Sequence, residues 1–509
     1  MWRGCTTASI RRRIPACVCV TFGIASESAL LKGKWVERSF STLVLHFCTE
    51  TTVLFPKSRK GTIPSLCQKG MVIAMDIALI SPKGVKMGRK EEMDKTARIY
   101  ADLVNIDSLQ ELMSCPNSPL LTIAAMATPY FDQIAYIDEE TEEIDWSRRY
   151  DMVGMSFMTQ QASRAYELAD AFRARGVYTI CGGMHPTNLP GQTLEHFDTV
   201  FIGEGEHTWP LFMQDYREGR PRRLYRNDRL VEMSEVLQPR YDLLDFSRYR
   251  TIPVQISRGC PHNCEFCAST KVYGPVYRHK SVQQVMEELQ LIRRYRRYPH
   301  VYFTDDNMLV NPRFSLQLLR EMKGMGIHWM THTDIGVASR QEILRHLYDA
   351  GCRKMVIGFE SIVPQSLQSL EKWKFKRLPE YAKAIRVIQS YGIGVWGTFI
   401  VGLDSDDRSV FQRVVDFTME NHLYGAMISV PTPFPGSALF DRLNRENRIL
   451  TKHWGDYTLW NVVVRPKNMT VEELEEGFSY TLRQIYSPAA SRERQAYFRN
   501  IYHNRLERP

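Results

Sequence analysis

The chain lacks long apolar runs and any regular framework of cysteines. Across its 509 residues, no stretch approaches the roughly 20 apolar residues that a transmembrane helix needs. The 11 cysteines are odd in number and irregularly spaced, which argues against disulfide stapling and favours a reducing compartment. We therefore predict a cytoplasmic protein with no transmembrane segment.

The sequence also lacks an excess of basic residues beyond its first 70 positions. The formal net charge is +9, but residues 1–70 carry 11 Lys and Arg against 3 Asp and Glu, so nearly all of the charge lies there. The near-neutral remainder predicts no nucleic-acid partner. With 44% hydrophobic and 24% charged residues, the chain has the balance of a globular protein of two or three domains.

Residues 1–70 show no periodic pattern and no helix cap. Arg11–Arg13 followed by the apolar run 14–25 is typical of a secretion signal, and the Arg-rich, acid-poor composition is typical of a transit peptide. A third interpretation is that the segment is not native coding sequence and that translation starts at Met71 or Met75. We predict a cleaved or non-native extension and favour the third interpretation.

From residue 76 onward, short apolar runs alternate with helical patterns, which is typical of βαβ units and a parallel sheet. Within residues 71–220, strands are predicted at 77–80, 133–137, 152–157, 178–181 and 199–202. Ligands bind beyond the carboxyl ends of such strands, where glycine lets the backbone approach them closely. The candidate ligand-binding residues there are Gly182, Gly183, Gly203 and Gly205. Ordinary turn glycines are the alternative.

Residues 221–250 lack periodicity, and we predict a linker. The β/α alternation resumes over residues 251–440, with strands predicted at 253–257, 301–304, 354–359, 395–401 and 425–431. A β/α repeat of this size with so few strands predicts a partial (β/α)6 barrel rather than a full eightfold one. Residues 441–509 are predicted to form a helical C-terminal extension.

Three cysteines follow the first strand of this second β/α domain. Cys260, Cys264 and Cys267 lie within eight residues, in the segment Cys-Pro-His-Asn-Cys-Glu-Phe-Cys. Iron–sulfur clusters are held by thiolates, and a cubane has four irons, so three cysteines leave one iron open. The alternatives are a zinc site with His262 as the fourth ligand, or three unligated core cysteines. Structural zinc prefers two separated pairs of ligands.

This spacing, with an aromatic residue before the last cysteine, resembles the motif of radical S-adenosylmethionine (SAM) enzymes. Over residues 71–490, the chain resembles the family of radical SAM proteins that carry a cobalamin-binding domain. The resemblance implies a Rossmann-like, flavodoxin-type cobalamin-binding domain, then a partial (β/α)6 radical SAM barrel and the helical extension. It also implies a 4Fe-4S cluster on the three cysteines, whose open iron binds SAM and cleaves it to a 5′-deoxyadenosyl radical.

Further positions resemble family motifs residue by residue. Phe266 resembles the aromatic residue near the adenine of SAM, and Glu360 resembles the carboxylate that contacts the ribose. Asp305, Asp306 and Asn307 resemble the segment that accepts the amino group of SAM. A strand-end turn with a helix cap, or a surface carboxylate, is the alternative at these positions.

The first domain matches the family more loosely. Its glycine pairs at 182–183 and 203–205 resemble segments of cobalamin-binding domains, which makes cobalamin the third predicted cofactor. The loop 81–88 contains no histidine of the kind that ligates cobalt, so cobalt would lack that lower ligand. We interpret His185, which precedes a proline, as part of the loop geometry rather than as a ligand.

The resemblance implies methyl transfer to an unactivated carbon of a small-molecule substrate, with flavodoxin or ferredoxin as the electron donor. Cobalamin-linked oxidative cyclisation or rearrangement of a tetrapyrrole or other small molecule is one alternative, and a non-catalytic cobalamin or redox sensor is another. Methylthio transfer to transfer RNA would need a second cluster, for which Cys115, Cys181 and Cys352 make no ligand set.

Overall fold

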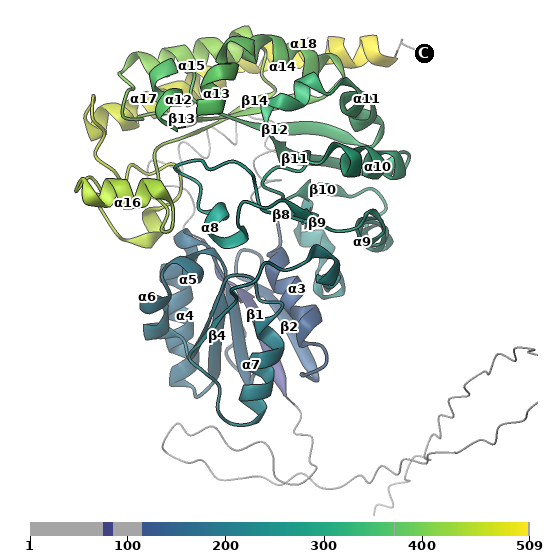
Figure 1. The fold of residues 1–509 in the computed structure, drawn as a ribbon, viewed down its shortest axis with the longest axis vertical. Helices are drawn as coiled ribbons and strands as arrows, with labels where there is room; N and C mark the ends of the chain where they lie inside the picture. Colours follow the sequence, from purple (N-terminus) through teal and green to yellow (C-terminus); the bar gives the residue numbers. More distant parts are fainter. Residues whose placement is uncertain (1–74, 85–114, 371, 507–509) are drawn as a thin grey trace, which may run out of the picture. The chain divides into compact units, whose positions relative to one another are not determined.

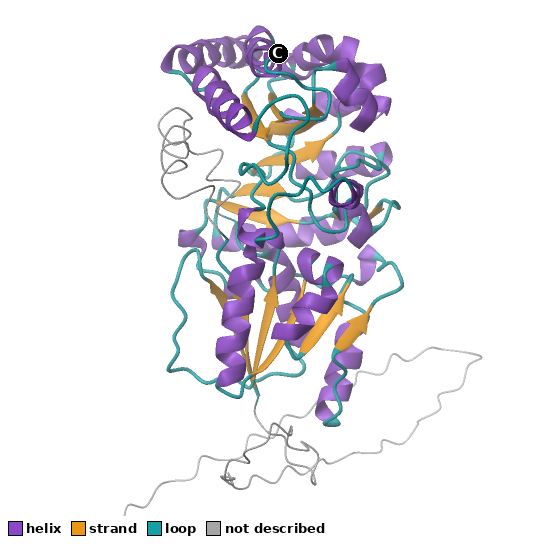
Figure 2. Cartoon of the chain, turned by 90° about the vertical axis from the view of Figure 1, so that its left-hand side faces the viewer, coloured by secondary structure: helices purple, strands orange, loops and turns teal. Residues whose placement is uncertain are grey.

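The computed structural model describes residues 75–84, 115–370 and 372–506. The predicted extension at 1–70 and positions 85–88 of the first loop lie outside the described residues. Two parallel sheets with flanking helices carry the fold (Figures 1 and 2). Among the described helices, none is both long and apolar enough to cross a membrane.

The first sheet has six parallel strands in the order β2-β1-β3-β4-β5-β6. They are β1 (Asp76–Ser81), β2 (Gln133–Asp138), β3 (Met152–Ser156), β4 (Tyr178–Gly182), β5 (Thr199–Ile202) and β6 (Leu224–Arg226). This is the flavodoxin-type order with one strand added, and it reverses direction between β1 and β3. A ligand crevice is therefore expected at the carboxyl ends of the strands beside that reversal.

Helices cover both faces of the first sheet. Ile77 of β1 packs in the cluster that includes α3 (Ser118–Ala127), and Ile80 packs in the cluster that includes α4 (Ala162–Ala174). A strand that is buried on both faces needs apolar residues at consecutive positions, which explains the apolar run in the sequence. The other helices of this region are α5 (Met184–Asn188), α6 (Pro190–His196) and α7 (Thr208–Arg217).

The second sheet also has six parallel strands, in the order β14-β13-β12-β11-β10-β7. They are β7 (Thr251–Val254), β10 (His300–Phe303), β11 (His328–Thr333), β12 (Cys352–Glu360), β13 (Gly394–Ile400) and β14 (Gly425–Ser429). The strands follow in chain order, and β7 and β14 are the two edges, as in a partial barrel. The main covering helices are α9 (Val282–Tyr295), α10 (Pro312–Met322), α11 (Gln341–Asp349), α14 (Tyr381–Ser390) and α15 (Ser409–Glu420).

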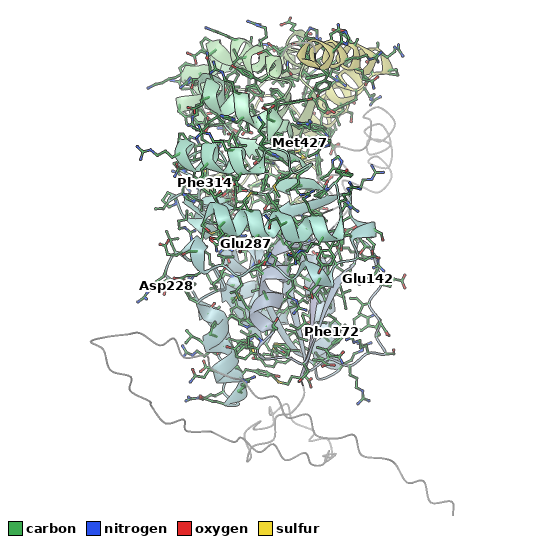
Figure 3. The ribbon with its side chains drawn as sticks, turned by 90° about the vertical axis from the view of Figure 1, so that its right-hand side faces the viewer. Glu142, Phe172, Asp228, Glu287, Phe314 and Met427 are labelled. Carbon is green, nitrogen blue, oxygen red and sulfur yellow. The ribbon has the colours of Figure 1, made fainter. Side chains whose placement is uncertain are left out.

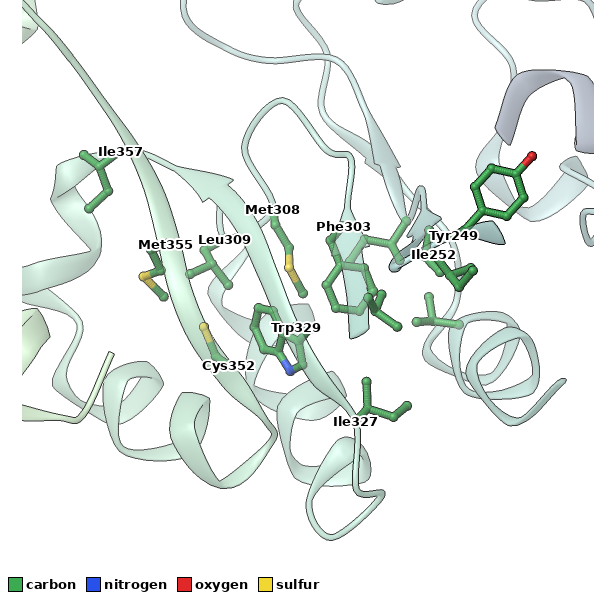
Figure 4. Packing of buried hydrophobic residues seen from close by; sticks show 14 of the residues in the cluster. Tyr249, Ile252, Phe303, Met308, Leu309, Ile327, Trp329, Cys352, Met355 and Ile357 are labelled. Atoms are coloured by element: carbon green, nitrogen blue, oxygen red, sulfur yellow. The ribbon is translucent and has the colours of Figure 1, made fainter. Parts of the chain in front are cut away.

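The helix-facing side of this sheet forms the main core. Figure 4 shows Phe303, Trp329 and Met355, from three neighbouring strands, lying within one apolar layer. All three are at most 2% exposed. Burial at this face sets the register of the strands, because a shift of one residue would turn these side chains to the opposite side.

The sequence prediction misses three strands, one of which, β9 (Arg278–His279), has only two residues, and it merges two others into one. β6 lies in the segment predicted as a linker, and its three residues are too few for a periodic pattern. β11 has histidine or threonine at four of its six positions, so it lacks an apolar run. The strand predicted at 253–257 is β7 together with β8 (Ser257–Arg258), which pairs antiparallel with β9 (Arg278–His279).

The C-terminal extension contains α16 (Ala438–Arg445), α17 (Val471–Ile485) and α18 (Pro488–Leu506). Leu439 of α16 packs in the cluster that includes β3 and α4 of the first domain, whereas Leu474 of α17 packs in the main core. The extension is thus helical, as predicted, and it shares apolar side-chain clusters with both sheets.

Candidate cofactor site

The three motif cysteines lie in the loop between β8 and α8 (Ser269–Tyr273). They form no disulfide with another described cysteine, and all three are partly buried. Burial raises the pKa of Cys260 to about 11 and also raises the pKa of Cys267. The surrounding protein therefore does not favour the thiolate form of Cys260 and Cys267, and a bound cluster would supply the positive charge that does.

The loop does not form a ready-made site for a single metal ion. Within the described ranges, no three His, Cys, Asp or Glu side chains are grouped closely enough to hold one. His262 instead stacks on Trp373, with 4.4 Å between ring centroids, and its Nε2 lies 3.7 Å from the Asp334 carboxylate. This arrangement disfavours the zinc alternative. A cubane cluster is larger than one ion, and its ligands lie further apart.

A glycine anchors the loop directly before its first cysteine. Gly259 has a φ of 85°, and a Cβ at this position would lie 2.2 Å from the carbonyl oxygen of Val276. Only glycine fits such a conformation and such a close approach. The segment around Val276, directly before β9, therefore fixes the path of the backbone into Cys260.

The three residues after β10 have different surroundings. Asp305 is 2% exposed and accepts hydrogen bonds from the amide and hydroxyl of Ser257, while burial raises its pKa to about 7. Asn307 donates to Asp334 (2.8 Å). The Asp306 carboxyl is partly buried, and burial raises its pKa. Two of the three side chains thus hold neighbouring segments, and Asp306 is the best placed for a ligand.

Glu360 ends β12 in a left-handed conformation, with a φ of 64°. Its carboxylate pairs with Lys374 at 2.8 Å and is nearly buried. The carboxylate folds back over Gly358, where a Cβ would lie 2.2 Å from Oε1 of Glu360. Strained backbone outside glycine is rare and is concentrated at functional sites. Glu360 is therefore a positioned carboxylate rather than a freely solvated one.

Phe266 is partly buried and packs against two apolar clusters, one of which contains Ile400, the last residue of β13, and Leu403. Its neighbour Glu265 accepts a hydrogen bond from Arg442 of α16 at 2.5 Å. The extension therefore holds the cysteine loop from outside, a contact that the sequence patterns did not reveal.

In the first domain, the predicted glycines lie at adjacent strand ends. Gly183 has a φ of 108°, and a Cβ there would lie 2.9 Å from the carbonyl oxygen of Phe157. Gly203 has a φ of 78°, and its amide donates to Thr187 of α5 at 3.0 Å. At Gly182 and Gly205 a Cβ would meet only ordinary contacts of 3.4–3.5 Å. The stronger conformational requirement therefore lies at Gly183 and Gly203.

The strand ends beside the β1–β3 reversal offer backbone and amide groups. Next to the reversal, an added Cβ at Gly84 would meet only Gln160 and Gln161, and Oε1 of Gln160 is buried without a hydrogen-bond partner. His185 is fully buried against Tyr166 and Phe157, which agrees with its interpretation as part of the loop geometry. The buried, unsatisfied Oε1 of Gln160 at these strand ends fits a ligand that carries amide groups, such as cobalamin.

Three family models match the chain. The radical SAM superfamily model matches residues 254–418, the B12 binding domain model matches residues 122–212, and a domain of unknown function (DUF4070) matches residues 437–509. The chain belongs to the family of cobalamin-binding radical SAM enzymes. The predicted family and fold class are thereby confirmed, and the two domain models support SAM and cobalamin as cofactors.

Relatives of this radical SAM enzyme include the bacteriochlorophyllide d C-12(1)-methyltransferase of Chlorobaculum tepidum. The two are 29% identical over 76% of this chain and 88% of that protein. Among solved structures, the radical SAM methyltransferase TsrM from Kitasatospora setae, with cobalamin and a [4Fe-4S] cluster bound, matches with a TM-score of 0.56 and 15% identity over 81% of this chain and 82% of that chain. The cobalamin-dependent SAM radical enzyme OxsB matches with a TM-score of 0.54 and 17% identity, over 74% of this chain and 56% of that chain.

A buried ion-pair network joins the cysteine loop of this radical SAM enzyme to its B12 binding domain. Arg258 pairs with Glu204 at 2.8 Å and with Glu206 at 2.7 Å, and Arg278 also pairs with Glu204 at 3.0 Å. The side chains are at most 11% exposed. Glu204 follows Gly203 and Arg258 precedes Gly259, so the network links two of the predicted ligand loops. Sequence reasoning noticed the glycines but not these charges.

The inner face of the radical SAM sheet, opposite its helices, carries a second apolar layer. The layer consists of Met330, Val356 and Trp396, with Tyr302, Tyr424 and Met427 partly buried beside them. His332 lies next to it and shares a 2.8 Å hydrogen bond with Tyr302. Burial lowers the pKa of His332 to about 4, so this imidazole is neutral at physiological pH.

Proposed function

We propose that this radical SAM enzyme methylates an unactivated carbon of an apolar small molecule, with a 4Fe-4S cluster held by Cys260, Cys264 and Cys267. The observation that carries the proposal is the buried Arg258–Glu204 link between the cysteine loop and the B12 binding domain. It holds the two predicted cofactor loops next to each other. The names of the methyltransferase relatives support the reaction class.

When bound, the cluster and SAM supply the 5′-deoxyadenosyl radical that abstracts hydrogen, and cobalamin carries the methyl group. The chain's own residues bind and orient these groups. We assign the SAM amino group to the Asp306 carboxylate and the ribose hydroxyls to Glu360, which Lys374 holds at 2.8 Å. Phe266, between two apolar clusters, lines the adenine side and excludes water there.

The apolar layer on the inner face of the barrel supports an apolar substrate. Met330, Val356 and Trp396 are at most 4% exposed, so the partly buried Tyr302, Tyr424 and Met427 beside them are the side chains that would meet a large hydrophobic ring system. The neutral His332 and its partner Tyr302 are the polar groups beside that layer that could orient a substrate. Tetrapyrroles and hopanoids, which name several relatives, are the first substrates to test.

We further propose that flavodoxin or ferredoxin supplies the electron and that the enzyme works in the cytoplasm. The described cysteines form no disulfide with one another, which fits a reducing compartment. The substrate is a small molecule.

The test is anaerobic reconstitution of the full chain with iron, sulfide and hydroxocobalamin, followed by incubation with methyl-labelled SAM, dithionite and a chlorophyllide or hopanoid. Four irons, stoichiometric cobalt, 5′-deoxyadenosine and labelled product would establish the reaction. Formation of 5′-deoxyadenosine without methyl transfer to any tested substrate would contradict methylation and favour oxidative cyclisation. If the protein binds cobalt but does not cleave SAM, the enzymatic proposal is wrong and a non-catalytic cobalamin sensor is favoured.

A further inference from the structure

The end of α9 carries a basic surface that the proposed function does not use. In it Arg294, Tyr295, Arg297 and Tyr298 are exposed, and Arg293 and Arg296 are half-buried. Its sequence is Arg293-Arg294-Tyr295-Arg296-Arg297-Tyr298, four arginines and two tyrosines in a row, here named the arginine–tyrosine surface. α9 leads into β10, so this surface lies at the amino-terminal edge of the second sheet. The proposed ligand residues after β10 and β12 lie at the opposite, carboxyl edge. Figure 3 labels Glu287, on the preceding turns of the same helix.

The positive charge of this surface is not neutralised. Among the residues that the structure describes, no carboxylate forms an ion pair with any of the four arginines. Arg296 donates instead to the backbone carbonyls of Arg250 and Phe246. The nearest acidic residues along the chain are Glu287 and Glu288 of α9: Glu288 pairs with Lys280 at 2.6 Å, and Glu287 accepts a hydrogen bond from Gln283 at 2.9 Å.

The two tyrosines expose large aromatic surfaces beside these charges. Tyr295 is 47% exposed and Tyr298 is 62% exposed. Tyr295 stacks on Phe246, with 4.9 Å between ring centroids, and Arg297 lies 5.2 Å from the ring of Tyr298. These contacts hold the rings in place while leaving their edges in solvent.

Helix stability alone does not explain the surface. Cations in the last turn of a helix interact favourably with its dipole, which accounts for Arg293 and Arg294. Arg297 and Tyr298 lie beyond the end of the helix, and neither belongs to the buried stripe of α9, which consists of Val285, Glu288, Leu289 and Ile292.

We propose that the arginine–tyrosine surface docks the enzyme peripherally on an anionic phospholipid bilayer. One guanidinium group can donate two parallel hydrogen bonds to a phosphate, and tyrosine rings are enriched at the level of lipid headgroups. Clustered basic residues beside a membrane strengthen binding additively. This inference goes beyond the proposed function, because docking would hold the enzyme on the bilayer by the edge of the second sheet opposite the proposed ligand residues.

Co-sedimentation of the full-length reconstituted enzyme with vesicles tests the proposal. Vesicles of phosphatidylcholine with phosphatidylglycerol are expected to bind the protein, and vesicles of phosphatidylcholine alone are not. The double variant Arg294→Gln/Arg297→Gln is expected to partition about 30-fold more weakly. Binding should also fall at about 1 M salt, where the screening length shrinks to about 3 Å.

The matched control is Lys383→Gln/Arg386→Gln, which removes the same charge from two exposed positions on α14. It should bind vesicles like the wild type. A third variant, Tyr298→Ser, keeps every charge and is expected to weaken binding through the aromatic contact alone. Equal thermal midpoints for all variants show that the fold is retained.

The proposal is overturned if the wild type ignores anionic vesicles, if the Arg294/Arg297 variant binds as well as the control, or if duplex DNA at equal phosphate concentration competes the protein off the vesicles. Dithionite-driven SAM cleavage without vesicles should be the same in all variants. Vesicle binding without any SAM cleavage would refute the proposed function and leave the membrane inference standing.

Discussion

The two sheets of this enzyme present different chemistry at their carboxyl ends. The first offers backbone and glycine, with Gly183 and Gly203 in left-handed conformations. The second offers carboxylates held by internal contacts, as when Ser257 binds Asp305 and Lys374 binds Glu360. A backbone crevice recognises the shape of a large ligand, whereas fixed carboxylates recognise the amino and hydroxyl groups of a small one.

The largest expected effect is a loss of the iron–sulfur cluster from the second domain with no loss of cobalt from the first. In Cys264→Ala, iron content and 5′-deoxyadenosine formation should fall to background, because a cubane with two protein thiolates is not retained. Cobalt content should stay at the wild-type level, since Cys264 lies in the second domain. Iron, sulfide and cobalt analysis after reconstitution measures both.

The control for this variant is Cys181→Ala on β4, whose buried thiol belongs to the apolar core of the first domain. It should keep full iron content. Loss of cobalt in Cys264→Ala, or loss of iron in Cys181→Ala, would contradict the division of roles.

The next largest effect breaks the link between the sheets. Arg258→Met removes the positive charge that pairs with the buried carboxylates of Glu204 and Glu206. The free energy of unfolding should fall by about 3–5 kcal/mol, because buried negative charge is left uncompensated. Fewer methyl groups should be transferred per 5′-deoxyadenosine, because the two loops are no longer held together. Urea unfolding and product ratios measure these changes.

Adding Glu206→Gln to Arg258→Met should restore part of the lost stability, because it removes one uncompensated charge. Arg220→Met, which removes an exposed arginine paired with Glu218, should leave stability unchanged within error. Equal losses in the buried and exposed variants would argue against the network.

A pH effect is expected from the second sheet. Burial raises the pKa of Asp406, after β13, to about 6, although Ser366 and two backbone amides donate to it. The native state holds this proton between about pH 4 and pH 6, while the unfolded chain has released it. The stability that this carboxyl contributes is therefore fully present below about pH 4 and is lost as the pH rises through 6. Over that range the free energy of unfolding falls by about 1.4 kcal/mol per pH unit.

Asp406→Asn should flatten that slope, because the amide does not titrate. Its oxygen can still accept from the two backbone amides, and its NH2 can donate to the Ser366 hydroxyl. Urea midpoints between pH 4 and pH 7 compare the two proteins. An unchanged slope in the variant would show that the Asp406 carboxyl is not the titrating group.

The smallest expected effect tests the backbone crevice. Gly183→Ala places a Cβ 2.9 Å from the Phe157 carbonyl at a φ of 108° and should weaken cobalamin binding about tenfold. Cluster content should not change. The control Gly191→Ala, in α6, meets no atom within 4 Å and should bind cobalamin normally. Optical titration with hydroxocobalamin measures both variants, and equal affinities would remove Gly183 from the site.

Strands with an uninterrupted apolar run were predictable. β1 and β5 were found from their apolar runs at 77–80 and 200–202, because burial on both faces demands apolar residues at consecutive positions. β13 was found although Gly397 and Thr398 interrupt its run. β11 and β6 were not, because polar residues interrupt the first and the second has only three residues. Their pairing depends on neighbouring strands, which no local window contains.

The sequence by itself determined the chemistry of the site, since the spacing of Cys260, Cys264 and Cys267 and the glycines of the first domain are local properties of the chain. Only the tertiary structure decided which charged side chains meet. Asp305 turns to Ser257 across 48 positions, and Arg258 pairs with Glu204 across 54. A buried charge needs a partner because desolvation is costly, and that partner is chosen by packing rather than by distance along the chain.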